Sequence, residues 1–331
     1  MNFLTRKPVY EEIEKRRDSK VVAFVTSDRS GMETQIAQDS VDLFVSLLDA
    51  IGPTKRISLI LHTNGGQTLA AWRLVNLLRT FCDELEVIVP AKALSAGTLI
   101  CIGGDKIIMT KQAVLGPIDP SVNNPLNPGV NVGNQVVRVP VSVENLRGYL
   151  DAIRQELEIK GEAALSQLLI KLADHVHPLV MGEVFRSRAQ IRFLAEKLLK
   201  GQVPDKEKMQ SIIDFLCADS GSHDYSINRR EAREFGLNVD KPDQELYDML
   251  KSVHASYVEE LKVLSPYSQQ AVLGGNANAT YSETRGLVEG TVGGCYQFVS
   301  EGLLTHVTLN TPMGQQIVVS DQRNFEGWRK V

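Results

Sequence analysis

Strand-like runs alternate with helix-like segments along the first 110 residues, and this alternation most strongly limits the folds that the chain can adopt. Short runs of β-branched and aliphatic residues without clean polar alternation indicate strands that are covered on both faces. They occur at residues 21–26, 57–63, 85–90 and 106–109. Strands that alternate with helices are joined by right-handed crossovers into a mostly parallel sheet. The sequence therefore predicts an α/β fold.

Two helices are predicted in the intervals between these strands. The first covers residues 39–52, with Asp39 or Ser40 as its N-cap and Gly52 as its stop. The second covers residues 67–81, where apolar residues recur at helical spacing. Each of two strands thus ends in a small turn and re-enters a helix.

These two strand-to-helix turns contain the residues that suggest a catalytic site. The first contains Gly65 and Gly66, and the second contains Ser95, Ala96 and Gly97. A helix start leaves backbone N–H groups without partners, so two such turns side by side form a pocket of donors that suits an oxyanion. Ser95 would place a hydroxyl beside it, as acyl transfer requires. The alternative is that both are ordinary tight turns and that Ser95 is only an N-cap.

The amino-acid composition of the chain changes after residue 115. The Pro-, Gly- and Asn-rich stretch that begins at Gly116 is expected to lack regular structure and to form a flap over about 116–142. Beyond it the sequence becomes helical, so a helical C-terminal half is expected. We predict helices over about 143–159, 162–174, 177–200 and 205–218, then a helical connector over 241–279. Residues 280–331 have a pattern typical of strands joined by turns and are predicted to be a small β appendage.

Composition excludes several classes of function. A net charge of −4 with interspersed acids and bases gives no basic surface for nucleic acid and no polybasic membrane patch. The start is charged and no run of eighteen apolar residues occurs, so we expect a cytoplasmic protein. The four cysteines are far apart and have no zinc spacing, so no metal is expected. A phosphate-binding loop is missing, and we predict no cofactor.

The stretches "HTNGG" and "AKALSAGTLICIGGDKIIMTKQAVLGPIDPS" resemble the serine dehydrogenase proteinase family, or SDH-type peptidases. This family is part of the Clp protease/crotonase fold, which includes signal peptide peptidase A. The resemblance extends over about residues 20–240, which we take as the peptidase domain, with a helical part over 143–219. It implies a spiral of ββα units, Ser95 as the nucleophile and the N–H groups of Gly66 and Ala96 as oxyanion donors. Relatives commonly have Pro-Gly-Gly where this chain has Asn64-Gly65-Gly66, which should lose some rigidity but keep the donors.

The general base stays open. A serine hydroxyl needs a neighbouring proton acceptor, usually His or an unprotonated Lys. The Clp proteolytic subunit has a His downstream of its serine, but the corresponding stretch here, "VLGPIDPSV", contains none. The acidic member of that triad has a counterpart in "DYSINRREAREFGL", which implies that Asp224 lies near the site. His223 precedes it, and because adjacent residues on an extended loop point to opposite sides, at most one should face Ser95. We favour His223.

Other bases are also candidates. His177 begins the long helix over 177–200, where a helix N-terminus lowers the pKa of an imidazole and keeps it neutral, although it can equally be an ordinary first-turn histidine. His62 is expected either to line the pocket or to be a buried, hydrogen-bonded residue. Signal peptide peptidase A uses a Lys, so lysines remain possible, although Lys92 and Lys111 are interpreted as solvated surface charges. The lysine candidates are Lys92, Lys111 and Lys160.

Three functions compete on these grounds. The first is a serine peptidase that cleaves peptides or unstructured segments without ATP. The second is a crotonase-like enzyme that acts on an acyl-CoA thioester with the same pair of amides. The third is a non-catalytic scaffold of the same fold. We adopt the serine peptidase, and because relatives of this fold form rings or trimers, we expect a homo-oligomer.

Overall fold

The computed structural model describes residues 2–118, 121–132, 135–219, 225–311 and 314–331. The chain divides into two compact units. The first unit comprises Met1–Leu115 and Asn228–Val331, and the second comprises Gly116–Ile227. The predicted peptidase domain of residues 1–240 therefore includes parts of both units, and its boundaries remain a prediction.

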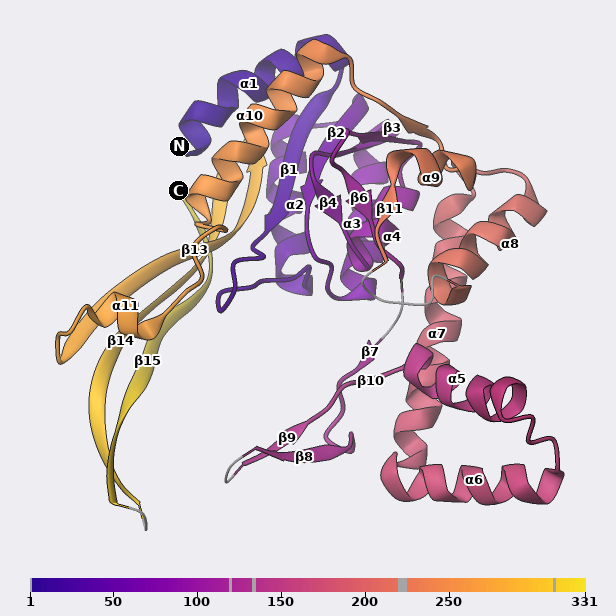
Figure 1. The fold of residues 1–331 in the computed structure, drawn as a ribbon. Helices are drawn as coiled ribbons and strands as arrows, with labels where there is room; N and C mark the ends of the chain where they lie inside the picture. The colour runs from indigo at the N-terminus through magenta and orange to yellow at the C-terminus, as the bar shows by residue number, and fades with distance from the viewer. Residues whose placement is uncertain (1, 119–120, 133–134, 220–224, 312–313) are drawn as a thin grey trace. The chain divides into compact units, whose positions relative to one another are not determined.

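An eight-stranded sheet forms the centre of the first unit (Figure 1). Its strands follow the order β12-β5-β3-β2-β1-β13-β14-β15, and the first five are parallel to one another. The parallel strands are β12 (Val239–Asp240), β5 (Lys106–Met109), β3 (Cys82–Val89), β2 (Thr54–His62) and β1 (Lys20–Thr26). The predicted α/β fold with a mostly parallel sheet is confirmed.

One layer of helices covers the face of β1 that bears Phe24. The ring of Phe24 meets that of Phe44 edge-to-face at 5.5 Å between centroids, and Phe44 lies on α2. The helices of this layer are α2 (Gln38–Ile51), α3 (Thr68–Phe81) and α4 (Ala96–Ile102). The predicted N-cap of α2 is wrong: Ala37 occupies that position, Asp39 lies in the first turn, and the Ser40 hydroxyl donates back to the Ala37 carbonyl at 2.6 Å. An acidic first turn stabilises a helix start without a side-chain cap.

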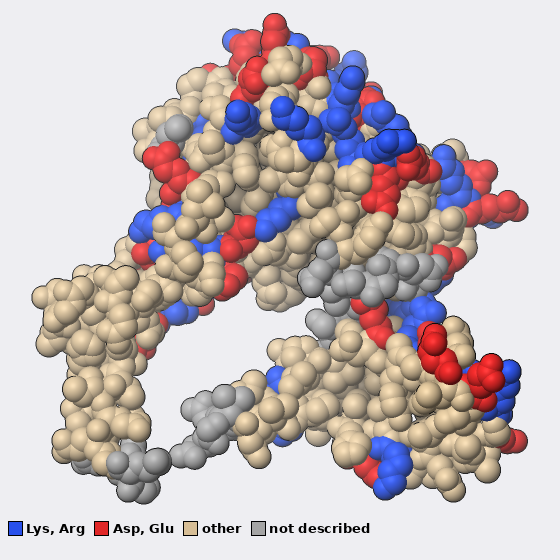
Figure 2. Space-filling model, in the orientation of Figure 1, with Lys and Arg blue, Asp and Glu red and all other residues tan. Residues whose placement is uncertain are grey.

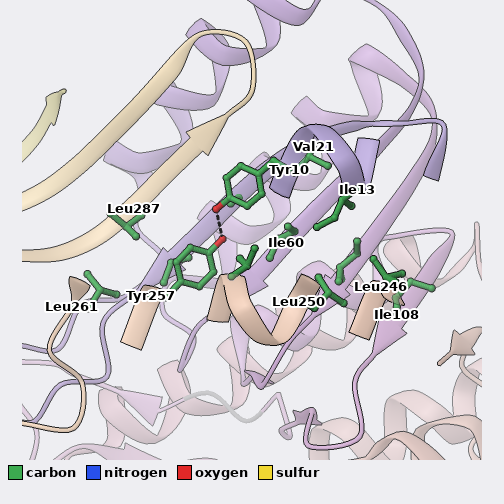
Figure 3. Packing of buried hydrophobic residues seen from close by; sticks show 14 residues of the cluster. Tyr10, Ile13, Val21, Ile60, Ile108, Leu246, Leu250, Tyr257, Leu261 and Leu287 are labelled. Atoms are coloured by element: carbon green, nitrogen blue, oxygen red, sulfur yellow. Dashed lines mark hydrogen bonds between the residues drawn. The ribbon is translucent and has the colours of Figure 1, made fainter. Parts of the chain in front are cut away.

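Two helices from opposite ends of the chain cover the other face of the sheet (Figures 1 and 3). They are α1 (Phe3–Arg17) and α10 (Gln244–Glu260). Tyr10, Val21 and Leu250 belong to the same buried cluster, which joins α1, β1 and α10. The sequence suggested no helix at the charged start, because the apolar residues that α1 buries are few.

A buried ionic network ties α1 to the C-terminal strands. Arg6 is 1% exposed and donates to Glu289 Oε2 at 3.0 Å, and Glu289 is fully buried. The hydroxyl of Tyr10 donates to the same carboxylate at 2.6 Å and lies 2.5 Å from the hydroxyl of Tyr257 (Figure 3). Buried charges are tolerated when paired and hydrogen-bonded in this way.

The last three strands continue the central sheet. They are β13 (Asn278–Gly290), β14 (Gly294–Thr311) and β15 (Gly314–Lys330). β13 pairs antiparallel with β1, so that Val22 lies opposite Gly290 and Thr26 lies opposite Gly286. The β segment expected from Thr280 is therefore present, but its backbone hydrogen bonds make it part of the main sheet.

The second unit is built mainly from helices. They are α5 (Val143–Asp151), the π-helical turn η1 (Ala152–Glu156), α6 (Glu162–His175), α7 (Pro178–Leu199), α8 (Lys206–Asp214) and the π-helical turn η2 (Phe215–Asp219). A small core that includes Val143, Leu146, Val180 and Val184 joins α5 to α7. The predicted helices of the C-terminal half are thus confirmed. Among the residues that the structure describes, no helix is both long and apolar enough to cross a membrane.

The expectation that the segment after Gly116 lacks regular structure is wrong. It contains the short strands β7 (Ser121–Val122) and β10 (Val141–Ser142), which pair with each other. Between them, β8 (Gly129–Val132) and β9 (Gln135–Arg138) form an antiparallel pair. Pro and Asn residues are concentrated before β8, where a turn needs them, whereas the strands themselves are rich in valine.

Charges on the visible surface are mixed. In Figure 2, Lys and Arg side chains alternate with Asp and Glu side chains over the first unit, without a continuous basic area on this face. Proteins that bind nucleic acid through its phosphates gather Lys and Arg on one face. The face shown has no such concentration.

Candidate active site

The diglycine turn that follows β2 has a backbone that only glycine adopts readily. Gly65 has φ 111° and Gly66 has φ 145°. Ile36 crosses this turn, donating its N–H to the Gly65 carbonyl at 2.8 Å and accepting from the N–H of Gln67 at 2.8 Å. A Cβ on Gly66 would lie 2.3 Å from the Ile36 carbonyl oxygen. Both positions therefore require glycine, as expected for a close approach of backbone.

Ser95 lies in a strained backbone conformation at the start of α4. Its φ is 50° and its ψ is −115°, and a non-glycine residue in such a region costs of the order of 1–3 kcal/mol. It occupies the N-cap position, but its side chain makes no capping hydrogen bond. Ser95 thus stands at the N-cap position, as the alternative interpretation has it, but its hydroxyl does not serve the helix start. Strain of this kind persists where the surrounding structure holds it, and it gathers at functional sites.

The two turns lie against each other. A Cβ on Gly65 would be 2.8 Å from Ser95 Cβ and 2.8 Å from the Leu94 carbonyl oxygen. A Cβ on Gly97 would be 2.5 Å from Cγ2 of Thr63, which precedes the diglycine turn. The strands are tied by hydrogen bonds from the Thr63 N–H to the Lys92 carbonyl at 3.2 Å and from the Leu94 N–H to the Thr63 carbonyl at 3.1 Å. The structure thus brings Ser95 and its predicted neighbours together.

Two amide groups at this contact have their N–H directed away from the backbone ladder. Ile36 bonds to residues 65 and 67 in a parallel bridge, so the N–H of Gly66 faces the opposite side. Ala96 is the first residue of α4, where an N–H has no partner within the helix. Ser95 itself is half-buried and Asn64 is exposed. A polar group of a ligand can therefore reach this place.

The predicted bases of this site remain predictions. His223 and Asp224 lie outside the described residues. His177 belongs to the second unit, where it is exposed and caps α7 by accepting the Leu179 N–H at Nδ1, at 3.2 Å. A neutral imidazole that accepts at Nδ1 holds its proton at Nε2, so it has no free lone pair in this conformation.

A cluster of titratable side chains lies in the first unit beside the strand that leads to Ser95. Lys92 forms an ion pair with Asp28, and His62 Nε2 is 3.7 Å from Asp28 Oδ1. Lys92 is only 25% exposed, so its interpretation as a solvated surface charge is wrong. Burial opposes ionisation of Asp28, but hydrogen bonds and charges from His62 and Lys92 outweigh it and hold its pKa below the usual range. Sequence reasoning missed Asp28, which stands apart from the motifs.

His62 and His254 are stacked within this cluster. Their ring centroids are 5.1 Å apart. Burial, reinforced by the neighbouring His62, lowers the pKa of His254 to about 4. Nδ1 of His62 and Nε2 of His254 are buried and make no hydrogen bond to any described residue. Of the two expectations for His62, the buried residue is the one that the structure shows, on the side of β2 that faces α10.

A cleft of about 480 Å³ opens on the side of the diglycine turn. Its wall includes Thr26 at the end of β1, the loop of residues 33–37 and the turn of residues 64–66. The opposite wall consists of Arg285, Phe298, Glu326 and Trp328, from β13, β14 and β15. No local sequence pattern indicates these residues, because they meet the turn only through the β1–β13 pairing.

The described residues contain no cluster of side chains suited to binding a metal ion. No group of three or more His, Cys, Asp or Glu side chains is arranged there to hold a metal ion. All four cysteines are free, and burial raises the pKa of the Cys82 thiol to about 11. A thiol with such a pKa is a poor nucleophile. Ser95 is thus the most suitably placed nucleophile at the two turns.

Comparison with known proteins supports the resemblance. Residues 1–136 match the family described as ClpP-like SDH-type serine proteinase. Two proteins of Methanocaldococcus jannaschii, MJ0137 and MJ1495, are 29% and 28% identical over 255 and 260 residues, which is 75% of this chain in each case and 78% and 76% of theirs.

Three similar solved structures are proteases. Two are variants of the 1510-N membrane-bound stomatin-specific protease, at 16% and 18% identity and a TM-score of 0.36 each, the second with a substrate peptide; they cover 70% and 68% of this chain and 85% and 78% of their own. A third is a variant of ClpP1 from Listeria monocytogenes, at 15% identity and a TM-score of 0.38, covering 72% of this chain and 99% of its own. The match of residues 1–136 to the ClpP-like SDH-type serine proteinase family confirms what the sequence implied: the chain is a serine peptidase by class.

Proposed function

We propose that Ser95 is the nucleophile of this peptidase and that the N–H groups of Gly66 and Ala96 form its oxyanion hole. The observation that carries the proposal is the strained Ser95, free of any capping bond, held against the diglycine turn. A hydroxyl beside two unpaired amides is the arrangement that acyl transfer requires.

The reaction proceeds in two steps. Ser95 Oγ attacks the carbonyl carbon of a peptide bond and passes its proton to the base, while the carbonyl oxygen becomes an oxyanion between the two amides. The C–N bond breaks, and the base returns the proton to the leaving amine. Water then attacks the acyl-enzyme by the same route and frees Ser95. Each oxyanion donor is worth about 3–4 kcal/mol of transition-state stabilisation.

The base is proposed among the residues that the resemblance and the sequence indicated, His223 with Asp224, or His177. For His177 to act, its ring must release the Leu179 N–H, because that bond occupies Nδ1. His223→Ala, Asp224→Asn and His177→Ala are compared by the pH dependence of kcat/KM. Loss of the acidic limb in one variant, with Ser95 labelling at high pH retained, identifies the base. An unchanged profile in all three would exclude them.

The substrate is proposed to be an unstructured peptide segment, cleaved without ATP by a self-assembled form of the chain. None of the residues of α6 is buried, and two of its apolar side chains are largely exposed, Leu169 at 48% and Ile170 at 63%. Apolar side chains left exposed on a helix are typical of an association surface. Light scattering of the purified chain, with Leu169→Lys/Ile170→Lys as the disrupted variant, tests the assembly.

A serine-directed fluorophosphonate tests the nucleophile. We expect covalent labelling of the native chain, loss of labelling in Ser95→Ala, and full labelling in Ser46→Ala, which removes an exposed serine from α2. Cleavage of a permanently unfolded protein should follow the same order, whereas its folded counterpart should resist. Labelling of Ser95→Ala at the native rate would refute the assignment.

A further inference from the structure

The cleft beside the diglycine turn has the features of a specificity pocket. It is lined by Gly65 and by Gly66, which belongs to the proposed oxyanion hole, and it extends to β13, β14 and β15. Its volume, about 480 Å³, falls within the range of roughly 300–1,000 Å³ that small ligands occupy. A peptide held at Ser95 would place one neighbouring side chain there. We propose that this pocket selects a lysine or arginine side chain next to the scissile bond, an inference that rests on the proposed function.

The aromatic wall of the pocket consists of two rings in contact. Phe298 and Trp328 lie opposite each other on β14 and β15, and their rings meet edge-to-face at 5.4 Å between centroids. Gly286 supports them, since a Cβ there would be 3.1 Å from the Trp328 ring and 3.3 Å from Phe298 Cβ. A fixed aromatic surface packs against the methylene stem of a long basic side chain and attracts its cation.

The single cation of the wall is already neutralised. Arg285 is 13% exposed and donates to Glu326 Oε2 at 3.1 Å and to Ser300 Oγ at 2.9 Å. It also donates to the carbonyl oxygen of Met32 at 3.3 Å. Because its donors are committed to these partners, Arg285 cannot serve as the receptor for an acidic substrate side chain.

Two carboxylates of the pocket remain for a ligand. Glu33 and Asp39 line it and are exposed, and neither forms an ion pair with any described residue. The Glu33 carboxylate accepts the N–H of Gly31 at 3.1 Å, while its backbone carbonyl accepts from Arg285. With Arg285 paired to Glu326, these two groups give the pocket an excess of negative charge. Charge and aromatic surface together favour a basic side chain over an apolar one and exclude an acidic one.

Peptide binding to Ser95→Ala tests the proposal without requiring turnover. Three fluorescein-labelled alanine–glycine peptides carry lysine, norleucine or glutamate at the centre, and their Kd values are measured by anisotropy. We expect the lysine peptide to bind at least tenfold more tightly than the glutamate peptide, with norleucine between them. Equal affinities, or no binding of the lysine peptide at millimolar concentration, would overturn the proposal.

Charge reversal in the pocket gives the matched comparison. In the Ser95→Ala background, Glu33→Lys/Asp39→Lys should abolish or invert the preference, whereas Asp49→Lys, on the same helix but outside the pocket, should retain it. Trp328→Leu should weaken binding of both the lysine and the norleucine peptides. A preference that survives the double reversal would contradict the assignment. Fluorophosphonate labelling of the native chain reports the proposed function separately, so failure of one is distinguishable from failure of the other.

Discussion

Gly65→Ala is expected to disable the site while the chain stays folded. Gly65 has φ 111°, which costs an L-residue about 1–3 kcal/mol. Its new Cβ would lie 2.8 Å from the Leu94 carbonyl oxygen and from Ser95 Cβ, whereas ordinary contacts begin at 3.4 Å. The neighbour is backbone, so the turn that bears Ser95 must move by about 0.6 Å, and misplacement by about 1 Å can cost a hundredfold in rate. We therefore expect the rate of fluorophosphonate labelling to fall at least about tenfold.

Gly52→Ala separates strain from the effect on the site. Gly52 also has positive φ, 71°, but a Cβ there meets nothing within 4 Å. Both variants should lose about 1–3 kcal/mol of unfolding free energy in urea, and only Gly65→Ala should lose labelling. Equal labelling of Gly65→Ala and the native chain would refute the contact between the two turns. Equal loss in both variants would instead attribute the effect to general destabilisation.

Three further substitutions test the energetics of the first unit. Arg6→Met should cost about 3–5 kcal/mol in urea unfolding because it leaves the buried Glu289 unpaired, and Arg6→Met/Glu289→Leu should cost less than the single change. Ser95→Gly should unfold at higher urea concentration than Ser95→Ala, by about 1 kcal/mol, since glycine adopts φ 50° without strain. His254 has a pKa lowered to about 4, so its neutral form contributes stability that is complete above about pH 6.5 and declines as the pH falls toward 4. His254→Leu should remove about 1–2 kcal/mol of that decline between pH 7 and 5, after allowance for partial exposure, and an unchanged slope would contradict the assignment.

The parallel strands and the two strand-to-helix turns were predictable because local patterns encode them. Buried parallel strands such as β2 read as unbroken aliphatic runs, and the turns that follow them need small residues for close approach. Gly65 and Ser95 could therefore be paired from the sequence alone. Their contact depends only on Thr63 and Ala93 lying side by side in a parallel bridge, which follows from the fold class.

The remaining features depend on contacts between distant segments. The pairing of β1 with β13 joins residues 22–26 to 286–290, and no local pattern reports such a partner. Arg6 looks like a surface charge in the sequence, yet it is buried because Glu289 arrives from β13. The aromatic wall formed by Phe298 and Trp328 was missed for the same reason, since it reaches the diglycine turn through that pairing.

The turn at Asn64 shows how the site is held without the proline that relatives commonly have there. Thr63 Oγ1 accepts the N–H of Gly65 at 2.9 Å, and it receives the hydroxyl of Thr26 at 2.7 Å. Ile36 fixes the other side of the turn through its two backbone bonds. A proline would fix one φ angle through its ring, whereas here four hydrogen bonds fix the turn, three of them from neighbouring segments. These bonds hold the two glycines from β1 and from the loop after it, and we expect them to offset the loss of rigidity. The placement of the diglycine turn against Ser95 therefore depends on tertiary structure more than on the residue at position 64.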